Sequence, residues 1–389
     1  MILGVYIQVP FCQTKCTYCN FHTGVVSRDR YAPYAGAVCR EIALWSAKQR
    51  GDLSGGAVDT VYFGGGTPSL LDPSALAQIL ASLRPRFLQA SVPEITLEAD
   101  PETVTAEKAA AWLDVGFNRI SLGAQSFDDR ELRSAGRMHR RVDIHQAVQL
   151  LRDAGFRNIS MDLIAGLPHQ TRETWEESLT ELLRIRPEHV SIYMLEVDEG
   201  SRLGKESLAG GSRYSAGAIP SDDAIAEFYE VACARLAREG YEHYEISNWG
   251  LPGRWSTHNL KYWRRAPYVG FGAGAHSFDG LTRWANIHDS ARYVSCIEQG
   301  NSTREQIEMV TAGRALEEEF FLGLRQMDGI DLERIERDYN PALRDQLVTL
   351  RERISGLRSQ GLVELDGTRL RLAPDRLTVS NEVFTELLG

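Results

Sequence analysis

The sequence lacks the features of a chain that crosses a membrane or binds nucleic acid. It has no run of eighteen apolar residues, so no segment is expected to span a bilayer. Its first eleven residues include no Lys, no Arg and no cleavage site, so we expect no signal peptide. Acidic residues outnumber Lys and Arg by 53 to 43, and a chain with a net charge of −10 is not expected to bind nucleic acid.

Cysteine is scarce, and half of the six cysteines lie in one short segment. Cys12, Cys16 and Cys19 fall within eight residues, directly after an apolar, strand-like run. Three thiolates so spaced can reach three corners of one [4Fe–4S] cluster. No fourth cysteine follows nearby, so one iron of such a cluster would stay free for another ligand. The alternative is three unrelated core cysteines, because cysteine is often buried as a small hydrophobe.

The remaining cysteines are scattered. Cys39, Cys233 and Cys296 lie in helix-like or mixed sequence, and we expect them to be free structural thiols. Free thiols and an oxygen-sensitive cluster both suit a reducing compartment, so a cytoplasmic protein is expected.

Strand-like and helix-like segments alternate through the first half of the chain. The expected strands are Val5–Val9, Thr60–Phe63, Ile95–Ala99, Arg119–Gly123, Ile159–Ile164 and Val190–Leu195. The expected helices between them are Tyr31–Lys48, Pro73–Phe87, Ala106–Val115, Val142–Ala154 and Thr171–Arg184. This alternation predicts an α/β fold with a parallel sheet, and six such units predict a partial (β/α)6 barrel.

The sequence changes character after this region. Residues 200–220 are rich in Gly and Ser and predict an irregular loop, a helix is expected over 221–238, and residues 241–287 mix aromatic and polar residues with strand-like pieces. We therefore expect one α/β domain over residues 1–300, with its extension, and a second domain over residues 301–389.

The second domain combines helices with a hairpin. Helices are expected over 306–324, 332–339 and 342–360, and Asp366-Gly367 predicts the turn of a hairpin that follows them. Helices followed by a hairpin are typical of a winged-helix-like domain. Residues 305–389 hold 11 Arg, no Lys and 17 acidic residues, so contact with a protein or a lid role is favoured over DNA binding.

Polar and glycine-rich segments follow the expected strands at the same end of the sheet. Gly64-Gly65-Gly66-Thr67-Pro68 follows the second strand, Glu98 ends the third, Gln125 follows the fourth and Asp162 lies in the fifth. Parallel barrels build their sites at this edge, so these residues and the cysteine loop predict one composite ligand pocket.

Each of these residues also has an ordinary structural interpretation. The three glycines allow backbone amides to approach a ligand, or they form a tight turn. Glu98 and Asp162 could accept hydrogen bonds from ribose hydroxyls or an ammonium group, or they cap helices or face solvent. Arg137 could bind a carboxylate with its guanidinium, or it is a solvated arginine at a helix end.

Several motifs resemble a known superfamily. Cys12-x₃-Cys16-x₂-Cys19 after Tyr-Ile-Gln-Val-Pro-Phe, followed by the Gly-Gly-Gly-Thr-Pro segment, resembles the radical S-adenosylmethionine (radical SAM) superfamily. The segments Leu122–Phe127, Met161–Thr171 and His258-Asn-Leu-Lys-Tyr-Trp263 are similar to its HemN/HemW branch. That branch holds oxygen-independent coproporphyrinogen III oxidases and HemW haem chaperones, and the resemblance covers essentially the whole chain.

The resemblance implies roles for individual residues. It implies that Cys12, Cys16 and Cys19 ligate a [4Fe–4S] cluster whose free iron binds S-adenosylmethionine. It places the S-adenosylmethionine contacts at Tyr6, Gly65, Gly66, Thr67, Glu98, Gln125, Arg137 and Asp162. Tyr18 holds an aromatic position that packs on adenine in this superfamily, or it shields the cluster. The partners implied are a protein reductant and, for the chaperones, haem and haem-requiring acceptors that include membrane enzymes.

Two departures separate the chain from the oxidases. The oxidases carry a further cysteine two residues after the third, where this chain has Phe21, and a long segment before the cysteine loop, where this chain has eleven residues. Both features resemble the chaperones, so we expect haem binding without oxidase activity. The alternatives are an active radical decarboxylase and a plain iron–sulfur protein. His22, His258 and His276 are candidate haem ligands, and the sequence does not choose among them.

Overall fold

A curved sheet with parallel strands at its centre organises the molecule. The computed structural model describes residues 2–45 and 57–388. Six parallel strands follow one another in the sheet in chain order. They are β1 (Ile2–Val9), β2 (Ala57–Gly65), β3 (Leu88–Ala99), β4 (Arg119–Gln125), β5 (Ile159–Ala165) and β6 (His189–Met194). Five of them contain the whole run from which they were predicted, and β6 ends one residue before the predicted Leu195, so the expected α/β fold is confirmed.

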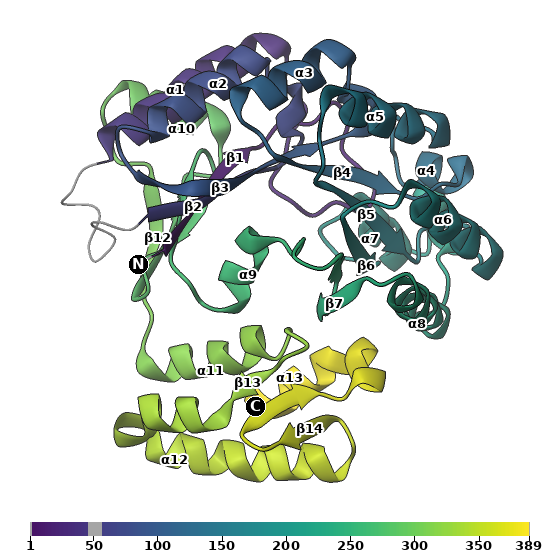
Figure 1. The fold of residues 1–389 in the computed structure, drawn as a ribbon, viewed down its shortest axis with the longest axis vertical. Helices are drawn as coiled ribbons and strands as arrows, with labels where there is room; N and C mark the ends of the chain where they lie inside the picture. The colour runs from purple at the N-terminus through teal and green to yellow at the C-terminus, as the bar shows by residue number, and fades with distance from the viewer. Residues whose placement is uncertain (1, 46–56, 389) are drawn as a thin grey trace.

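Helices connect these strands and cover the convex face of the sheet (Figure 1). They are α1 (Tyr31–Leu44), α2 (Pro73–Leu83), α3 (Ala106–Val115), α4 (Asp129–Ser134), α5 (Arg141–Ala154), α6 (Arg172–Ile185) and α8 (Asp222–Arg238). Helix α3 begins where Thr105 accepts a hydrogen bond from the Lys108 amide and ends at Gly116 with φ of 112°. Its Trp112 is fully buried in the core. The predicted end of the first helix, residues 46–48, lies outside the described residues.

The sheet continues beyond the six parallel strands on both sides. Next to β1 lie β9 (Tyr268–Phe271), which is parallel to it, then β10 (His276–Phe278), β11 (Thr282–Asn286) and β12 (Arg304–Met309). Next to β6 lie β8 (Asn248–Gly250) and β7 (Glu242–Glu245). The resulting twelve-stranded sheet has ends at β12 and β7 in the described chain, so the barrel is partial, as expected. Strand β12 follows residue 300 in the chain and belongs to this sheet.

Helices also form in regions where none was predicted, including residues 129–134, 290–298 and 380–388. Residues 200–220 form α7 (Arg202–Leu208) and a 3₁₀ segment instead of an irregular loop, because the Ser201 hydroxyl caps the helix by accepting from the Gly204 amide. Helix α9 (Thr257–Trp263) lies on the concave side of the sheet (Figure 1). The 3₁₀ segments are Arg28–Arg30, Pro68–Leu70, Pro101–Thr103, Arg213–Ala218 and Pro374–Val379.

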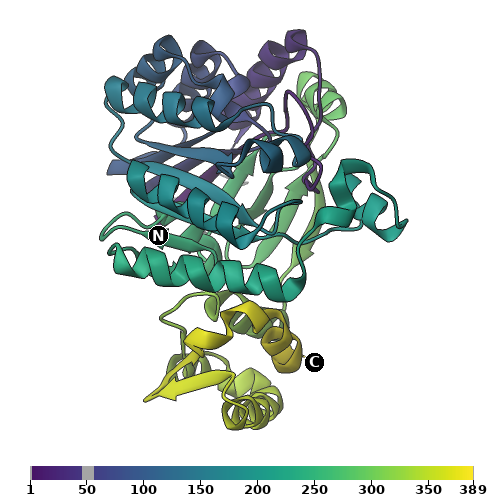
Figure 2. The same ribbon diagram turned by 90° about the vertical axis from the view of Figure 1, so that its right-hand side faces the viewer.

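The C-terminal part packs below the large sheet (Figures 1 and 2). It contains α11 (Ala312–Gly323), β13 (Ile330–Asp331), α12 (Leu332–Ser359), β14 (Val363–Asp366), β15 (Arg369–Leu372) and α13 (Ser380–Leu388). Helix α10 (Ser290–Glu298) precedes this part in the chain and packs on α1. The two predicted helices over 332–360 are one element with a break at Leu343. The hairpin is present, with Gly367-Thr368 as its loop, one residue later than predicted.

Charged and backbone contacts join the C-terminal part to the large sheet. Arg265 Nε lies 2.9 Å from Glu318 Oε2, and Arg283 also pairs with Glu318. The Ile246 amide donates to the Arg325 carbonyl at 3.0 Å. Within the described residues, no helix is both long and apolar enough to cross a bilayer.

Candidate functional site

The cysteine loop follows β1 and is pinned by backbone hydrogen bonds. The Cys12 amide donates to the Gly24 carbonyl at 3.1 Å, which closes the loop on itself. Between the second and third cysteines, the amide of buried Thr17 donates to the Ala135 carbonyl at 3.0 Å and its hydroxyl to the Ser134 carbonyl at 3.1 Å. The C-terminal end of α4 therefore fixes the loop. The sequence did not single out Thr17, because its role depends on these distant contacts.

The three cysteines are free thiols of intermediate exposure on one loop. Burial raises the pKa of Cys12 to about 11, although the nearby hydroxyls of Thr23 and Thr67 lower it. Burial also raises the pKa of Cys19. The guanidinium of Arg137 donates to Cys16 Sγ at 3.3 Å. The residue types suit a cluster, because thiolates are the ligands that iron–sulfur clusters use.

The described residues contain no group of three or more His, Cys, Asp or Glu side chains arranged to hold one metal ion. The cysteine loop is therefore not a ready-made site for a single ion. A cubane cluster binds each of its cysteines at a different iron, so it requires a wider spacing of the thiolates than one ion does.

The glycine segment after β2 lies directly against the cysteine loop. The Gly66 amide donates to the Val9 carbonyl at 2.8 Å and the Thr67 amide to the Phe11 carbonyl at 2.7 Å. A Cβ atom at Gly66 would stand 2.5 Å from the Phe11 carbonyl oxygen, so only glycine permits this approach. Gly65 has φ of 111°, which also favours glycine. These glycines therefore form a tight turn, which brings the end of β2 against the cysteine loop.

Asp100 links two of the predicted site residues. It accepts from the Thr67 hydroxyl at 2.9 Å and pairs with the guanidinium of Arg137. Arg137 also donates to the Gly123 carbonyl at 2.9 Å and, as described above, to Cys16. Arg137 is thus a partly buried side chain with three hydrogen-bond partners, and not a solvated arginine at a helix end. The sequence analysis missed Asp100, although its position two residues after Glu98 near the end of one strand offered a signal.

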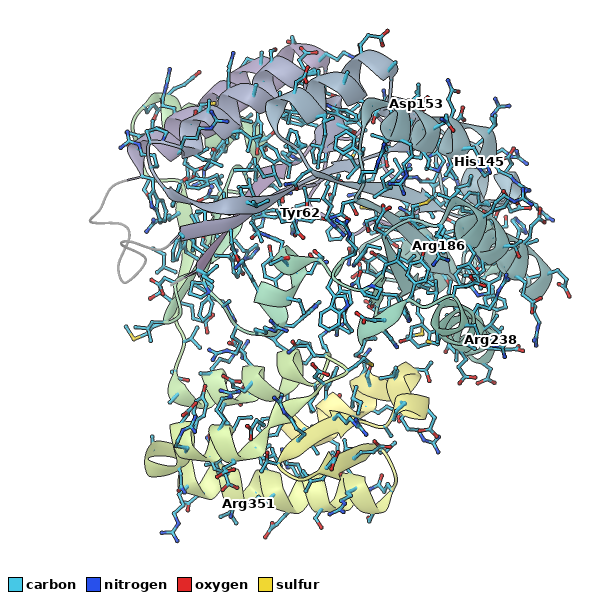
Figure 3. All side chains as sticks on the ribbon, viewed as in Figure 1. Tyr62, His145, Asp153, Arg186, Arg238 and Arg351 are labelled. Atoms are coloured by element: carbon cyan, nitrogen blue, oxygen red, sulfur yellow. The ribbon has the colours of Figure 1, made fainter. Side chains whose placement is uncertain are left out.

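Glu98 lies on the concave side of the sheet beside an aromatic pair. It accepts from the Tyr62 hydroxyl at 2.8 Å and from the Gly65 amide at 3.0 Å. The ring of Tyr6 stacks on that of Tyr62, with 6.0 Å between centroids. Figure 3 labels Tyr62 at the centre of this concave side. Burial, and to a smaller extent the charge of Asp162, raises the pKa of Glu98 to about 7, so it is only partly ionised at neutral pH.

Asp162 on β5 carries a polar atom without a partner. Its Oδ1 atom is buried and has no hydrogen-bond partner among the described residues. Burial raises its pKa to about 6, although hydrogen bonds from Ser191 and Ser121 and the charges of Arg119 and Arg137 lower it. Arg119 is 1% exposed, and its Nε and Nη1 atoms also lack partners. Buried polar atoms are rarely left unpaired, so these atoms favour a bound polar ligand inside the barrel.

Two further predicted residues flank this interior. Gln125 ends β4 with φ of 65°, a left-handed conformation that is uncommon for a residue other than glycine, and such backbone strain is often found at functional sites. Tyr18 packs against the small apolar cluster of Ala135, Ile164 and Leu167 beside the cysteine loop. Packing on adenine and shielding of a cluster both remain open for Tyr18.

The opposite end of the barrel is closed by α9. The amides of Thr257 and His258 each donate to Glu94 at 3.1 Å. His258 is 1% exposed, and its ring nitrogens lie 2.8 Å from Thr60 Oγ1 and 2.9 Å from the Tyr262 hydroxyl. Burial lowers its pKa to about 3, so the ring is neutral. Because Thr60 lies near the start of β2, His258 lies toward the amino ends of the strands, where its ring stacks on that of Tyr62 with 5.1 Å between centroids.

The other two candidate histidines lie together beside the cysteine loop. His22 and His276 are exposed, and both rings lie next to His288, with ring centroids 4.4 Å and 6.3 Å from it respectively. The sequence analysis did not single out His288, because it follows β11 and is distant in the chain from the cysteines.

Comparisons with known proteins cover both parts of the chain. The family model described as the radical SAM superfamily matches residues 6–182, and that described as the HemN C-terminal domain matches residues 310–375. The chain is 33% identical to "Heme chaperone HemW" of Bacillus subtilis over 99% of both chains. It is 34% identical to "Heme chaperone HemW" of Mycobacterium tuberculosis over 99% of this chain and 95% of that one.

The fold is similar to a solved structure. Coproporphyrinogen III oxidase (HemN) from Escherichia coli, described as a radical SAM enzyme, superposes with a TM-score of 0.83. The match covers 99% of this chain and 89% of that chain at 21% identity, which makes it a likeness of fold.

Proposed function

The chain belongs to the radical SAM superfamily and, within it, to the HemW family, and from this premise we propose that it is a haem chaperone. In this proposal the protein holds a [4Fe–4S] cluster and S-adenosylmethionine, takes up haem as cargo and delivers it to haem-requiring acceptor proteins. The observation that carries the proposal is the likeness over essentially the full length of the chain to relatives named haem chaperones.

The residues at the cysteine edge fit the two cofactors. Cys12, Cys16 and Cys19 would ligate three irons of the cluster, and the cluster would supply a redox centre with one open iron. Asp162 would offer its unpartnered Oδ1 atom to a donor group of S-adenosylmethionine. Glu98, already held by Tyr62 and Gly65, would place a second negative charge opposite a cationic group of that ligand.

Further predicted contacts would orient S-adenosylmethionine from neighbouring strands. We assign this role to Tyr6, Gly65, Gly66, Thr67, Gln125 and Arg137, with Tyr18 either on the adenine or over the cluster. Asp100 would act as a positioning residue, because it holds both Thr67 and Arg137.

One residue argues against oxidase activity. Phe21 occupies the position at which the oxidases carry a further cysteine, and its side chain is 65% exposed beside the cysteine loop. The likeness to HemN is one of fold, so it does not favour the oxidase reaction. We propose that the protein does not convert coproporphyrinogen III. The alternative function is that of an oxygen-independent coproporphyrinogen III oxidase, and detection of this conversion would favour it over the chaperone function.

The remaining parts of the proposal concern the cellular compartment, the electron donor and the C-terminal region. All six cysteines are free in the described chain, which suits a reducing, cytoplasmic compartment and a protein reductant as electron donor. We propose that the region after β12, including the HemN C-terminal match at 310–375, is a separate domain that contacts acceptor proteins.

Haem transfer tests the proposal directly. The anaerobically reconstituted protein is loaded with one equivalent of haem, separated from free haem, and mixed with the apo form of a haem-requiring enzyme. The proposal predicts that the Soret band of the loaded protein is replaced by that of the acceptor, and that acceptor activity appears. Failure to bind haem, or binding with transfer no faster than from free haem, would contradict it.

A further inference from the structure

Three histidines from separate segments of the chain meet beside the cysteine loop. His22 follows Cys19 on that loop, His276 begins β10, and His288 follows β11. The rings of His22 and His288 are in contact, with centroids 4.4 Å apart, and His276 lies 6.3 Å from His288. We call His22, His276 and His288 the histidine trio. The sheet topology brings these segments together, because β9, which leads to β10, pairs with β1, which leads to the cysteine loop.

The ring nitrogens of the trio are available, whereas those of other histidines are not. His258 and His189 are buried, and each has hydrogen-bond partners at both ring nitrogens. In contrast, His22 and His276 are exposed and have no hydrogen-bond partner at either ring nitrogen within the described chain. His288 Nδ1 is buried against Gly274 and has no partner there either. Two exposed imidazoles with free ring nitrogens, beside a third ring, indicate a site for a metal that binds an imidazole nitrogen.

The surroundings of the trio favour haem iron over a bare metal ion. In the part of the chain that the structure describes, no three His, Cys or carboxylate groups are placed to share one ion. Haem iron needs only one protein imidazole and an apolar surface for the porphyrin. Phe21 and Val25, on the same loop as His22, are 65% and 59% exposed and supply such a surface.

The spacing of the rings also limits how haem could be held. A porphyrin plane does not fit between two imidazoles whose centroids are 4.4 Å apart, so His22 and His288 cannot bind its two faces in this arrangement. Of this pair, one imidazole at a time would ligate the iron, and the opposite axial position would be open to His276, whose ring centroid lies 6.3 Å from that of His288, or to a ligand from an acceptor. Desolvation, with smaller effects from His288 and His22, lowers the pKa of His276 and favours the neutral ring that metals bind.

We propose that the histidine trio supplies the axial imidazole for the iron of the cargo haem, beside the cysteine loop and away from His258. This inference rests on the proposed chaperone function and adds to it the place where the cargo is held. It also gives Phe21 and Val25 a role as part of the porphyrin-contacting surface.

The test compares haem binding by full-length variants that are reconstituted anaerobically. The main variant is His22→Ala/His276→Ala/His288→Ala. The matched control is His169→Asn, at a histidine outside the trio with φ of 73°, a conformation that asparagine tolerates. Far-UV circular dichroism and cluster iron content establish that each variant folds. Haem titrations followed at the Soret band give affinity, and EPR of the ferric haem reports imidazole ligation.

The inference predicts that the triple variant binds haem at least tenfold more weakly and loses the imidazole-ligated EPR signal, while the control matches the wild type. In case the triple variant does not fold, the single exposed-site variant His22→Gly is tested with free imidazole, which should restore any lost signal. If the wild type binds haem and neither variant differs from it, the trio assignment is overturned and the chaperone function stands. If the wild type does not bind haem, both are overturned.

Discussion

The two ends of the same parallel strands differ in how their polar side chains are satisfied. At the amino ends, Glu94 accepts from the first amides of α9, His258 is bonded at both ring nitrogens, and Lys261 Nζ lies 2.7 Å from Asp59 Oδ1. Toward the carboxyl ends, Glu98 lies near the end of β3 and Asp162 in the middle of β5. Both have raised pKa values, and Asp162 keeps an unpartnered buried oxygen. Arg119, the first residue of β4, also keeps unpartnered nitrogen atoms, so the contrast between the two ends rests on Glu94 and His258 at one and on Glu98 and Asp162 at the other.

This comparison shows why a motif alone does not locate a binding site. The segment His258–Trp263 has the residue types of a metal- or haem-binding site. In this structure, however, His258 is buried and both of its ring nitrogens are hydrogen-bonded within the protein. His288 belongs to no motif, yet it lies against His22 beside the cysteine loop. The following changes test the contrast between the two ends.

The largest effect is expected at the cysteines. Cys16→Ala should abolish cluster assembly, because it removes one of the three proposed ligands and the contact of Arg137 with the thiol. Iron and sulfide analysis after anaerobic reconstitution measures this, with about four of each expected per wild-type chain. Cys233→Ala, at a free thiol on α8, is the matched control and should keep the full content. A cluster that persists in the Cys16 variant would refute the ligand assignment.

A smaller but clear effect is expected at Asp162. Asp162→Asn removes the charge of a carboxylate that is assigned to S-adenosylmethionine, and a lost hydrogen bond to a charged group corresponds to roughly a tenfold to hundredfold weaker affinity. The measurement is the S-adenosylmethionine concentration that half-saturates the change in the EPR signal of the reduced cluster. Asp153→Asn, on the exposed surface of α5 and labelled in Figure 3, should not differ from the wild type. Equal behaviour of the two variants would remove Asp162 from the site.

The pH dependence of the same binding follows from the two carboxylates. Their pKa values of about 7 for Glu98 and about 6 for Asp162 mean that both become protonated as the pH falls from 8 to 6. If S-adenosylmethionine prefers the ionised forms, its affinity should fall on the order of tenfold over this range, since one pKa unit corresponds to a tenfold change. Glu98→Gln should flatten the dependence. An affinity that rises toward pH 6 would contradict the charge assignment.

The smallest effect is expected at the closed end. Glu94→Ala removes the acceptor for the first amides of α9, and loss of such a cap lowers the free energy of unfolding by about 1 kcal/mol. Denaturant unfolding of this variant and of Glu199→Ala, an exposed carboxylate in a turn, measures the difference. The response to S-adenosylmethionine should not change. A variant of normal stability with a weakened response would show that the two ends are not separate in function.

Much of the large sheet could be predicted from the sequence, because its central strands are short apolar runs separated by well-marked helices. Helix α9 could not be predicted, because residues 241–287 mix aromatic and polar side chains without a clear period. In addition, the first amides of this helix donate to Glu94, which belongs to a strand distant in the chain. Helix α7 was missed because nearby Gly and Ser residues suggested a loop. Composition could not reveal that residues 304–309 continue the large sheet instead of starting a helix.

The residues of the candidate site also fall into two groups, those that the sequence could suggest and those that it could not. Glu98, near the end of β3, and Asp162, within β5, could be proposed from the sequence because parallel strands build sites at their carboxyl ends. Asp100 offered only its position two residues after Glu98. Thr17 and Arg119 could not be proposed, because their importance depends on partners, or on the absence of partners, that only the folded chain reveals.

The most direct test of the central claim measures haem binding and coproporphyrinogen turnover in one preparation. The reconstituted protein, with its cluster intact, is given reductant, S-adenosylmethionine and coproporphyrinogen III, and a parallel sample is titrated with haem. The account predicts a Soret shift that saturates on haem addition and no accumulation of protoporphyrinogen IX. Formation of protoporphyrinogen IX over many turnovers per chain, without haem binding, would contradict it.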